Sequence, residues 1–317
     1  MGDTGKIHAI CVSEKKGTQK HAVTEAEFVA GHGISGDAHA GPWHRQVSLL
    51  SFERIEEFRA RARLAESGGG KGIAIDFGAF AENLVVEGFD FPCLPLGTLF
   101  QSGDILLEMT QVGKECHSHC HIFHTVGDCI MPREGVFTRV LRGGVLRCGA
   151  ALGIARRYRA GIITASDKGA RGEREDLSGG AIREFAAANG YDVASYALLS
   201  DDQPLLEAEM RRLADGGLAD LILTTGGTGF SPRDRTPEAT LAVAERLVPG
   251  IAEAMRHASL AVTPRAMLSR AVSVIRGATL IINLPGSPKA VQESLAAING
   301  ALRHGLDVLA GPPADCS

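Results

Sequence analysis

The sequence predicts a chain of two domains, a β-rich, barrel-like domain followed by a three-layer α/β domain with a mostly parallel sheet. Three observations lead to this fold class. The length of 317 residues allows two domains that each bury a core. Near residue 155 the pattern changes from short apolar runs between turn residues to an alternation of strands and helices. Six of the seven cysteines and nine of the eleven histidines precede residue 150, so the two halves have different chemistry.

The composition argues against several classes of protein. A formal net charge of −4 disfavours non-specific binding to nucleic acid, which requires a basic surface. No apolar run approaches the roughly 20 residues that cross a bilayer, and the first residues lack the apolar core of a signal peptide. An odd number of cysteines without such a signal is typical of reduced thiols. We therefore expect a cytoplasmic protein with no membrane or nucleic-acid partner.

The elements of the first domain follow from alternating apolar residues and turn signals. Ser51 is placed to cap a helix over residues 51–65, which carries apolar residues at helical spacing. The glycine-rich run that follows lacks the spacing of a nucleotide-binding loop and is interpreted as a plain loop. Strands are expected over residues 46–50, 83–87 and 105–109.

The second domain alternates strands with amphipathic helices, which is typical of a parallel sheet covered on both faces. A basic segment over residues 155–159 is interpreted as a linker, and we place the domains at residues 1–153 and 154–317. Strands are expected over residues 161–165, 191–199, 220–225, 272–276 and 279–284. Helices are expected over residues 178–189, 203–214, 237–247, 251–260 and 288–309.

Three polar segments follow predicted strands of the second domain, at residues 166–167, 224–238 and 283–289. Since ligands of open α/β sheets bind at the carboxyl ends of the strands, all three segments should meet at one edge. Glycines and a helix N-terminus expose backbone N–H groups that suit phosphate. Lys289 is placed to neutralise a phosphate, and the carboxylate of Asp234 to bind Mg²⁺.

The string TTGGTGFSPRDRTPE at residues 224–238, with LPGSPK at residues 284–289, closely resembles the signature of molybdopterin adenylyltransferases. This family includes bacterial enzymes and the G domains of gephyrin and plant Cnx proteins. The resemblance extends over residues 159–309. It implies transfer of AMP from Mg²⁺-ATP to the terminal phosphate of molybdopterin, with release of pyrophosphate. It also implies a homo-oligomer, expected to be a trimer.

Site residues are carried over from this resemblance by position. Asp234 corresponds to the essential acidic residue after the glycine-rich loop and Asp201 to the second acidic position, and both would hold Mg²⁺. We favour Asp201 over its neighbour Asp202 from its spacing to Gln203, and a helix cap stays an alternative role for Asp234 and Asp201. The expected nucleotide and substrate site comprises Ser166, Asp167, Thr225, Gly226, Gly227, Thr228, Gly229, Ser231, Pro285, Gly286, Ser287 and Lys289.

The first domain carries GHGISGDAHAG at residues 31–41, WHRQVSL at 43–49 and GAFAENL at 78–84. Together these segments resemble the MOSC domain, named after the C-terminal domain of molybdenum-cofactor sulfurases, over residues 6–149. The resemblance implies a small β-rich fold that binds the cofactor or carries sulfur on a cysteine. Arg45, His44 and Arg133 are possible ligands of an anionic phosphate or molybdate, although exposed arginines are more often solvated.

Cys116 is the cysteine that matches the sulfur carrier implied by this resemblance, and Lys114, His117 and His119 nearby would favour its thiolate. The surrounding segment is denser in ligands than a single carrier requires, which leaves a Zn²⁺ or Fe site open. A third alternative is that these side chains form a polar rim with buried cysteines as small apolar groups. The candidate metal ligands are Cys116, Cys120, His124 and Cys129.

Taken together, the sequence predicts an enzyme of molybdenum-cofactor biosynthesis that adenylylates molybdopterin with ATP in its second half and handles cofactor or sulfur in its first. Other cofactor-biosynthesis proteins or molybdoenzymes are expected partners. The main alternative is a non-catalytic carrier or scaffold for molybdopterin, which would not need a Mg²⁺ carboxylate at Asp234. A metal- or thiol-binding protein built on residues 116–129 is a third hypothesis, and it leaves the second half unexplained.

Overall fold

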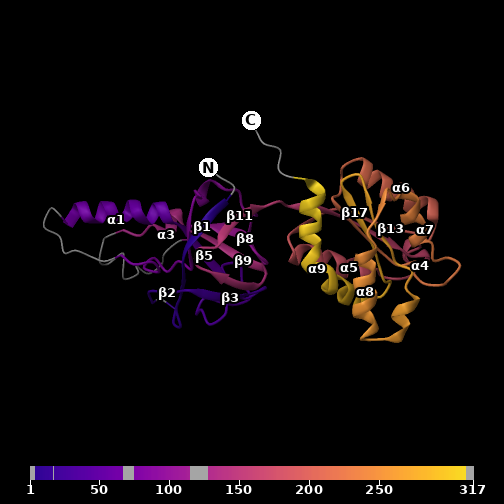
Figure 1. Cartoon of the computed structure of the whole chain (residues 1–317), viewed down its shortest axis with the longest axis horizontal. Helices are drawn as coiled ribbons and strands as arrows, with labels where there is room; N and C mark the ends of the chain where they lie inside the picture. The colour runs from indigo at the N-terminus through magenta and orange to yellow at the C-terminus, as the bar shows by residue number, and fades with distance from the viewer. Residues whose placement is uncertain (1–3, 17, 67–74, 115–127, 312–317) are drawn as a thin grey trace. The chain divides into compact units, whose positions relative to one another are not determined.

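The computed structural model describes residues 4–16, 18–66, 75–114 and 128–311, and the chain divides into two compact units, Met1–Arg156 and Arg157–Ser317. Figure 1 shows the elements of both units. Within the described ranges, no helix combines the length and apolar character needed to span a membrane.

The first unit is built around a closed barrel of seven strands. In the order β11, β7, β8, β9, β5, β6 and β1, neighbouring strands are hydrogen-bonded, and β1 pairs with β11 to close the ring. Among the strands that the structure describes in this barrel, β5 and β6 alone pair in parallel, and β2 extends the sheet beyond β1. The strands are β1 (Thr4–Val12), β2 (His21–Val23), β5 (Val47–Ser51), β6 (Leu84–Glu87), β7 (Leu99–Ser102), β8 (Ile105–Val112), β9 (Val136–Arg142) and β11 (Ala151–Ala155).

Apolar side chains that alternate along these strands fill the barrel, including Ile7, Leu49, Leu84 and Leu107. A second apolar cluster packs the long helix α1 against the outside of the barrel through Ile55 and Phe58. The other elements are a small sheet of β3 (Glu25–Val29), β4 (Gly33–Ile34) and β10 (Gly144–Arg147), and the helices α1 (Phe52–Glu66), η1 (Phe91–Cys93) and α3 (Met131–Glu134).

The second unit contains a six-stranded mixed sheet in the order β13, β12, β14, β17, β16 and β15. The first four strands pair in parallel, whereas β17–β16 and β16–β15 pair antiparallel. The sheet is therefore mixed: the predicted parallel arrangement holds for its first four strands, and β16 and β15 form an antiparallel edge. The strands are β12 (Tyr158–Ala165), β13 (Tyr191–Leu199), β14 (Leu221–Thr225), β15 (Arg246–Leu247), β16 (Ser273–Arg276) and β17 (Thr279–Leu284).

Helices cover both faces of this sheet, which explains why every residue of β14 and β17 is buried. One apolar cluster joins α5, α8 and α9 to one face, and another joins α6 and α7 to the opposite face (Figure 1). The helices are α4 (Asp167–Ala170), α5 (Leu177–Ala188), α6 (Gln203–Asp215), α7 (Thr236–Val243), α8 (Pro249–Leu260), η2 (Pro264–Leu268) and α9 (Pro288–Ala310).

The predicted helix over residues 237–247 is wrong at its C-terminal end. α7 stops at Val243, and the backbone becomes extended at Ala244. Arg246 and Leu247 then form β15, which pairs with Val274 and Ile275 of β16. Pairing at the edge of the sheet thus overrides the helical pattern of this segment.

Candidate active site

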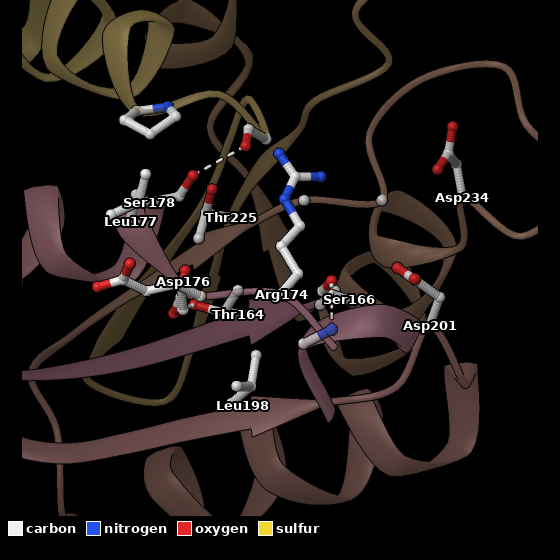
Figure 2. Close-up of a pocket in the computed structure, with 17 residues that line it drawn as sticks. Thr164, Ser166, Arg174, Asp176, Leu177, Ser178, Leu198, Asp201, Thr225 and Asp234 are labelled. Atoms are coloured by element: carbon white, nitrogen blue, oxygen red, sulfur yellow. Dashed lines mark hydrogen bonds between the residues drawn. The ribbon is translucent and has the colours of Figure 1, made fainter. Parts of the chain in front are cut away.

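A cavity of about 240 Å³ lies in the second unit where β12, β13 and β14 reach their carboxyl ends. Figure 2 shows polar side chains from these strand ends and from the loops that follow them around the cavity. In open α/β sheets ligands bind at this edge. The predicted site residues that line the cavity are Ser166, Asp201, Thr225, Gly226, Gly227, Asp234 and Gly286.

The glycine-rich turn after β14 packs closely against the end of β12 and the start of α7. Gly226 and Gly227 have φ of 88° and 62°, values that favour glycine. A Cβ atom on Gly226 would lie 2.2 Å from the carbonyl oxygen of Ala165 at the end of β12. A Cβ atom on Gly227 would lie 2.4 Å from Oγ1 of Thr236. The turn therefore cannot carry side chains, and its bare backbone borders the cavity.

Two loops meet at Asp201. The backbone N–H of Asp167 donates to Asp201 Oδ2 at 2.9 Å, and the backbone N–H of Asp201 donates to Asp167 Oδ1 at 3.1 Å. Arg233 donates from its guanidinium to both carboxylate oxygens of Asp167, at 3.0 and 2.7 Å. Burial raises the pKa of the Asp201 carboxyl, and the negative charges of Asp167 and Asp234 add to that rise. Asp201 and Asp234 thus repel each other at the cavity wall, an arrangement that a bound cation would stabilise.

The loop around Asp234 is held by Arg270. The Arg270 guanidinium donates to the carbonyl oxygen of Gly229 at 2.7 Å and to that of Asp234 at 2.6 Å, and it pairs with Glu238. The Asp234 carboxylate in turn accepts the backbone N–H of Ser231 at 2.8 Å. Hydrogen bonds within the loop therefore fix the position of the carboxylate.

Neither Asp201 nor Asp234 is a helix cap. α6 is capped by Asp202, whose side chain accepts the backbone N–H of Leu205 at 3.2 Å. The residue at the cap position of α7 is Arg235, which makes no side-chain capping bond. Of the adjacent pair, Asp201 lines the cavity and Asp202 caps the helix.

Sequence reasoning missed Asp176, which also lines the cavity. Its carboxylate accepts hydrogen bonds from the hydroxyls of Thr164 and Tyr196, both at 2.6 Å, and from the backbone N–H of Gly179 at 2.8 Å. Against the effect of burial, these bonds hold the pKa of Asp176 below its usual range. Its place one residue before α5 is the capping signal that could have identified it.

The remaining predicted residues lie around the cavity rather than in its wall. Thr228, Gly229 and Pro285 border a neighbouring cavity of about 270 Å³. The Ser287 side chain caps α9 by accepting the backbone N–H of Ala290 at 3.3 Å.

Lys289 does not line the cavity where a phosphate was expected. Its side chain is 80% exposed, and its ammonium lies 3.8 Å from a carboxylate oxygen of Glu293 one turn further along α9. The reason is its position on the helix, where the (i, i+4) geometry pairs the two side chains on the outer surface.

The first unit contains a smaller cavity of about 110 Å³ with a basic wall. Lys20, Arg45 and Lys114 line it together with Trp43 and Phe137. The Arg45 guanidinium lies 5.0 Å from the ring centre of Trp43, and its buried Nε has no hydrogen-bond partner among the described residues. A basic cavity with an unsatisfied donor suits an anion.

Buried carboxylates shape the wall of this basic cavity. Lys20 is almost fully buried and donates to both oxygens of Asp37 at 3.0 Å. Glu82 is fully buried and accepts the backbone N–H groups of Gly78 and Phe80 at 2.6 and 3.0 Å. Ala81, directly before Glu82 in the chain, takes a left-handed conformation with φ of 63° and lines the cavity. Asp37 and Glu82 thus both accept backbone N–H groups of loops.

The predicted sulfur carrier Cys116 lies outside the described residues, as do Cys120 and His124 of the predicted metal site. Cys129 is described and buried. Among the described residues no group of three or more His, Cys, Asp or Glu side chains is arranged to hold a metal ion. Burial raises the pKa of the Cys11 thiol to about 12, so this buried cysteine is not a thiolate at neutral pH.

Comparison with known families matches both units. Residues 161–304 match the family described as "Probable molybdopterin binding domain", and residues 36–153 match the MOSC domain.

Curated relatives align with the second unit. The molybdopterin adenylyltransferase of Helicobacter pylori is 41% identical over 153 residues, which cover 48% of this chain and 87% of that protein. The molybdopterin adenylyltransferase of Escherichia coli is 42% identical over 146 residues, covering 45% and 74%. A molybdenum cofactor biosynthesis bifunctional protein of Synechococcus elongatus is 39% identical over 152 residues, covering 48% of this chain and 47% of that protein.

Among solved structures, the molybdopterin biosynthesis enzyme MoaB of Thermus thermophilus is 52% identical with a TM-score of 0.47. The match covers 49% of this chain and 98% of that one.

Proposed function

The chain belongs to the molybdopterin adenylyltransferase family through its second unit, and we propose that this unit transfers AMP from ATP to the terminal phosphate of molybdopterin. One observation carries the proposal. Two carboxylates, those of Asp201 and Asp234, line the same cavity as the glycine turn at Gly226 and Gly227, which leaves no room for side chains. Such a site can hold phosphates against backbone N–H groups and place a metal beside them.

The reaction is a displacement at phosphorus. An oxygen of the terminal phosphate of molybdopterin forms a bond to the α-phosphorus of ATP. The bond from that phosphorus to the bridging oxygen breaks, and pyrophosphate leaves with the electron pair. Such a transfer depends mainly on alignment and charge stabilisation. The bare turn at Gly226 and Gly227 allows the close approach of phosphate that alignment requires.

Asp201 and Asp234 fit a Mg²⁺ ion. Each carboxylate accepts one backbone N–H through Oδ2, and neither Oδ1 accepts a hydrogen bond among the described residues. Mg²⁺ is commonly bound by one or two carboxylates together with substrate phosphates, so a larger set of protein ligands is not needed. The ion would supply positive charge to the phosphates during transfer.

For the first unit we propose that the basic cavity at Lys20, Arg45 and Lys114 binds an anionic group of the cofactor. Arg45 offers a buried donor without a partner among the described residues, and its guanidinium lies over the Trp43 ring in a cation–π contact. A sulfur-carrier role for Cys116 stays a prediction from the MOSC resemblance. A cytoplasmic location, a trimer, and domain limits of 1–153 and 154–317 also stay predictions.

The experiment is anaerobic incubation of the full chain with molybdopterin, ATP and Mg²⁺, followed by chromatography for adenylylated molybdopterin. Asp234→Asn should lower the rate by about 100-fold or more, because it removes a charge that positions the metal. Asp202→Asn is the matched control, since asparagine also caps helices well and Asp202 does not line the cavity. If wild type and both variants bind molybdopterin but none forms the product, the chain is a carrier and the proposal is wrong.

A further inference from the structure

Arg174 stands out among the basic residues near the cavity of the second unit. It lies in the loop between α4 and α5 and lines the cavity, where Figure 2 shows its side chain extended among the other lining residues. Among the described residues no hydrogen bond or ion pair holds its guanidinium. An arginine in this setting has all its donors available for a ligand.

Two neighbouring arginines already form ion pairs with carboxylates. Arg171 in the same loop donates to both carboxylate oxygens of Glu173, at 2.8 and 3.0 Å. Arg233 is held in the same bidentate way by Asp167. Neither Arg171 nor Arg233 lines the cavity, and neither does Lys289.

The acidic charge of the cavity wall makes it important that Arg174, unlike Arg171 and Arg233, is not held by any carboxylate that the structure describes. Four carboxylates line the cavity, those of Glu175, Asp176, Asp201 and Asp234, and Arg174 is the one basic residue in the described wall. A nucleotide triphosphate brings several more negative charges into this space. One divalent ion held by Asp201 and Asp234 would leave part of the phosphate charge unneutralised, and a basic side chain in the wall would offset some of the remainder.

We propose that Arg174 is the phosphate-binding residue of this site and that it donates hydrogen bonds to the pyrophosphate portion of the bound nucleotide. This inference rests on the proposed adenylyl transfer. When the bond from the α-phosphorus to the bridging oxygen breaks, the electron pair moves to the departing pyrophosphate. Arg174 stabilises that added charge through N–H bonds and stays protonated throughout, so it transfers no proton. It takes the role that the sequence assigned to Lys289.

The test uses the full chain and the variants Arg174→Ala, Arg174→Lys and Arg171→Ala. Arg171→Ala is the matched control, because it removes an exposed arginine from the same loop that does not line the cavity. Calorimetry measures the affinity for inorganic pyrophosphate with Mg²⁺. Kinetics give the kcat and KM of the transfer for ATP and for molybdopterin. Melting temperatures verify that the variants fold.

Arg174→Ala should weaken pyrophosphate binding and lower kcat/KM for ATP by about 10- to 100-fold, the range of charge-assisted hydrogen bonds. The KM for molybdopterin should stay unchanged, Arg174→Lys should restore part of the loss, and added guanidinium should partly rescue Arg174→Ala. Arg171→Ala should behave as wild type.

Pyrophosphate affinity and kcat/KM within twofold of wild type in Arg174→Ala would overturn the inference and leave adenylyl transfer standing. An effect confined to the KM for molybdopterin would also overturn it, because the phosphate bound by Arg174 would then belong to the acceptor. If wild type transfers no AMP but binds pyrophosphate through Arg174, the proposed function fails while the phosphate site stands.

Discussion

Replacing Gly227 by alanine perturbs the glycine-rich turn at a point where the structure leaves no room. Alanine in the left-handed conformation of Gly227 costs about 1–2 kcal/mol. The new Cβ atom would lie 2.4 Å from Oγ1 of the buried Thr236 and 3.2 Å from Oδ1 of Asp201. Overpacking of this kind costs about 1–3 kcal/mol. For a unit of this size, the melting temperature should fall by roughly 4–20 °C.

The same substitution should also reduce activity, since the clash acts on Asp201 directly. Calorimetry of the full chain gives the melting temperature, and the adenylylation assay gives kcat/KM, which should fall by at least about 100-fold. Gly300→Ala is the matched control, because a Cβ there contacts nothing within 4 Å and alanine favours the helix by about 0.5–1 kcal/mol. A Gly227→Ala chain that melts within 2 °C of wild type and transfers AMP at the wild-type rate would refute the close approach at this turn.

Three other substitutions test the structure, one in the second unit and two beside the basic cavity of the first. Arg270→Gln removes the guanidinium that holds two carbonyls of the glycine-rich loop, so single-turnover transfer should slow by about 10-fold or more; an unchanged rate would mean that the loop keeps its shape alone. Lys20→Met leaves the buried Asp37 without its cation and should destabilise the first unit by about 3–5 kcal/mol, measured by urea unfolding through the single tryptophan, which lies in that unit. Burial raises the pKa of Glu82 to about 7, so its contribution to stability is full below pH 4.5 and is lost as the pH rises through 7. The same tryptophan signal should show the first unit weakening by up to about 3 kcal/mol between pH 5 and 8.5 in wild type, and a slope that persists in Glu82→Gln would assign it to another group.

The strands and most helices could be predicted because local pattern and tertiary packing agree there. The buried runs of β12, β14 and β17 follow from apolar sequence. The start of α6 at Gln203 was predicted, but its cap is Asp202 and not Asp201. The end of α7 could not be predicted, since residues 244–247 suit a helix and only the nearby edge strand β16 makes them extended.

The sequence predicts which backbone segments meet at the candidate site better than it predicts which side chains point into it. Strand order places the glycine-rich turn and Asp234 at one edge of the sheet, whereas Asp201 was assigned to the site from the family resemblance. The direction of a side chain in the first turn of a helix or in a loop is set by tertiary contacts. For that reason Lys289 was expected in the site, whereas Arg174 and Arg270 were not assigned to it.

The central claim is most directly tested by following two labels of ATP through the reaction. The full chain is incubated anaerobically with molybdopterin, Mg²⁺ and ATP labelled with ³²P at either the α- or the γ-phosphate. We expect the α label to elute with the pterin and the γ label with pyrophosphate, and we expect both signals to be lost in Asp234→Asn. Recovery of both labels in unchanged ATP, from a chain that still binds molybdopterin, would contradict adenylyl transfer.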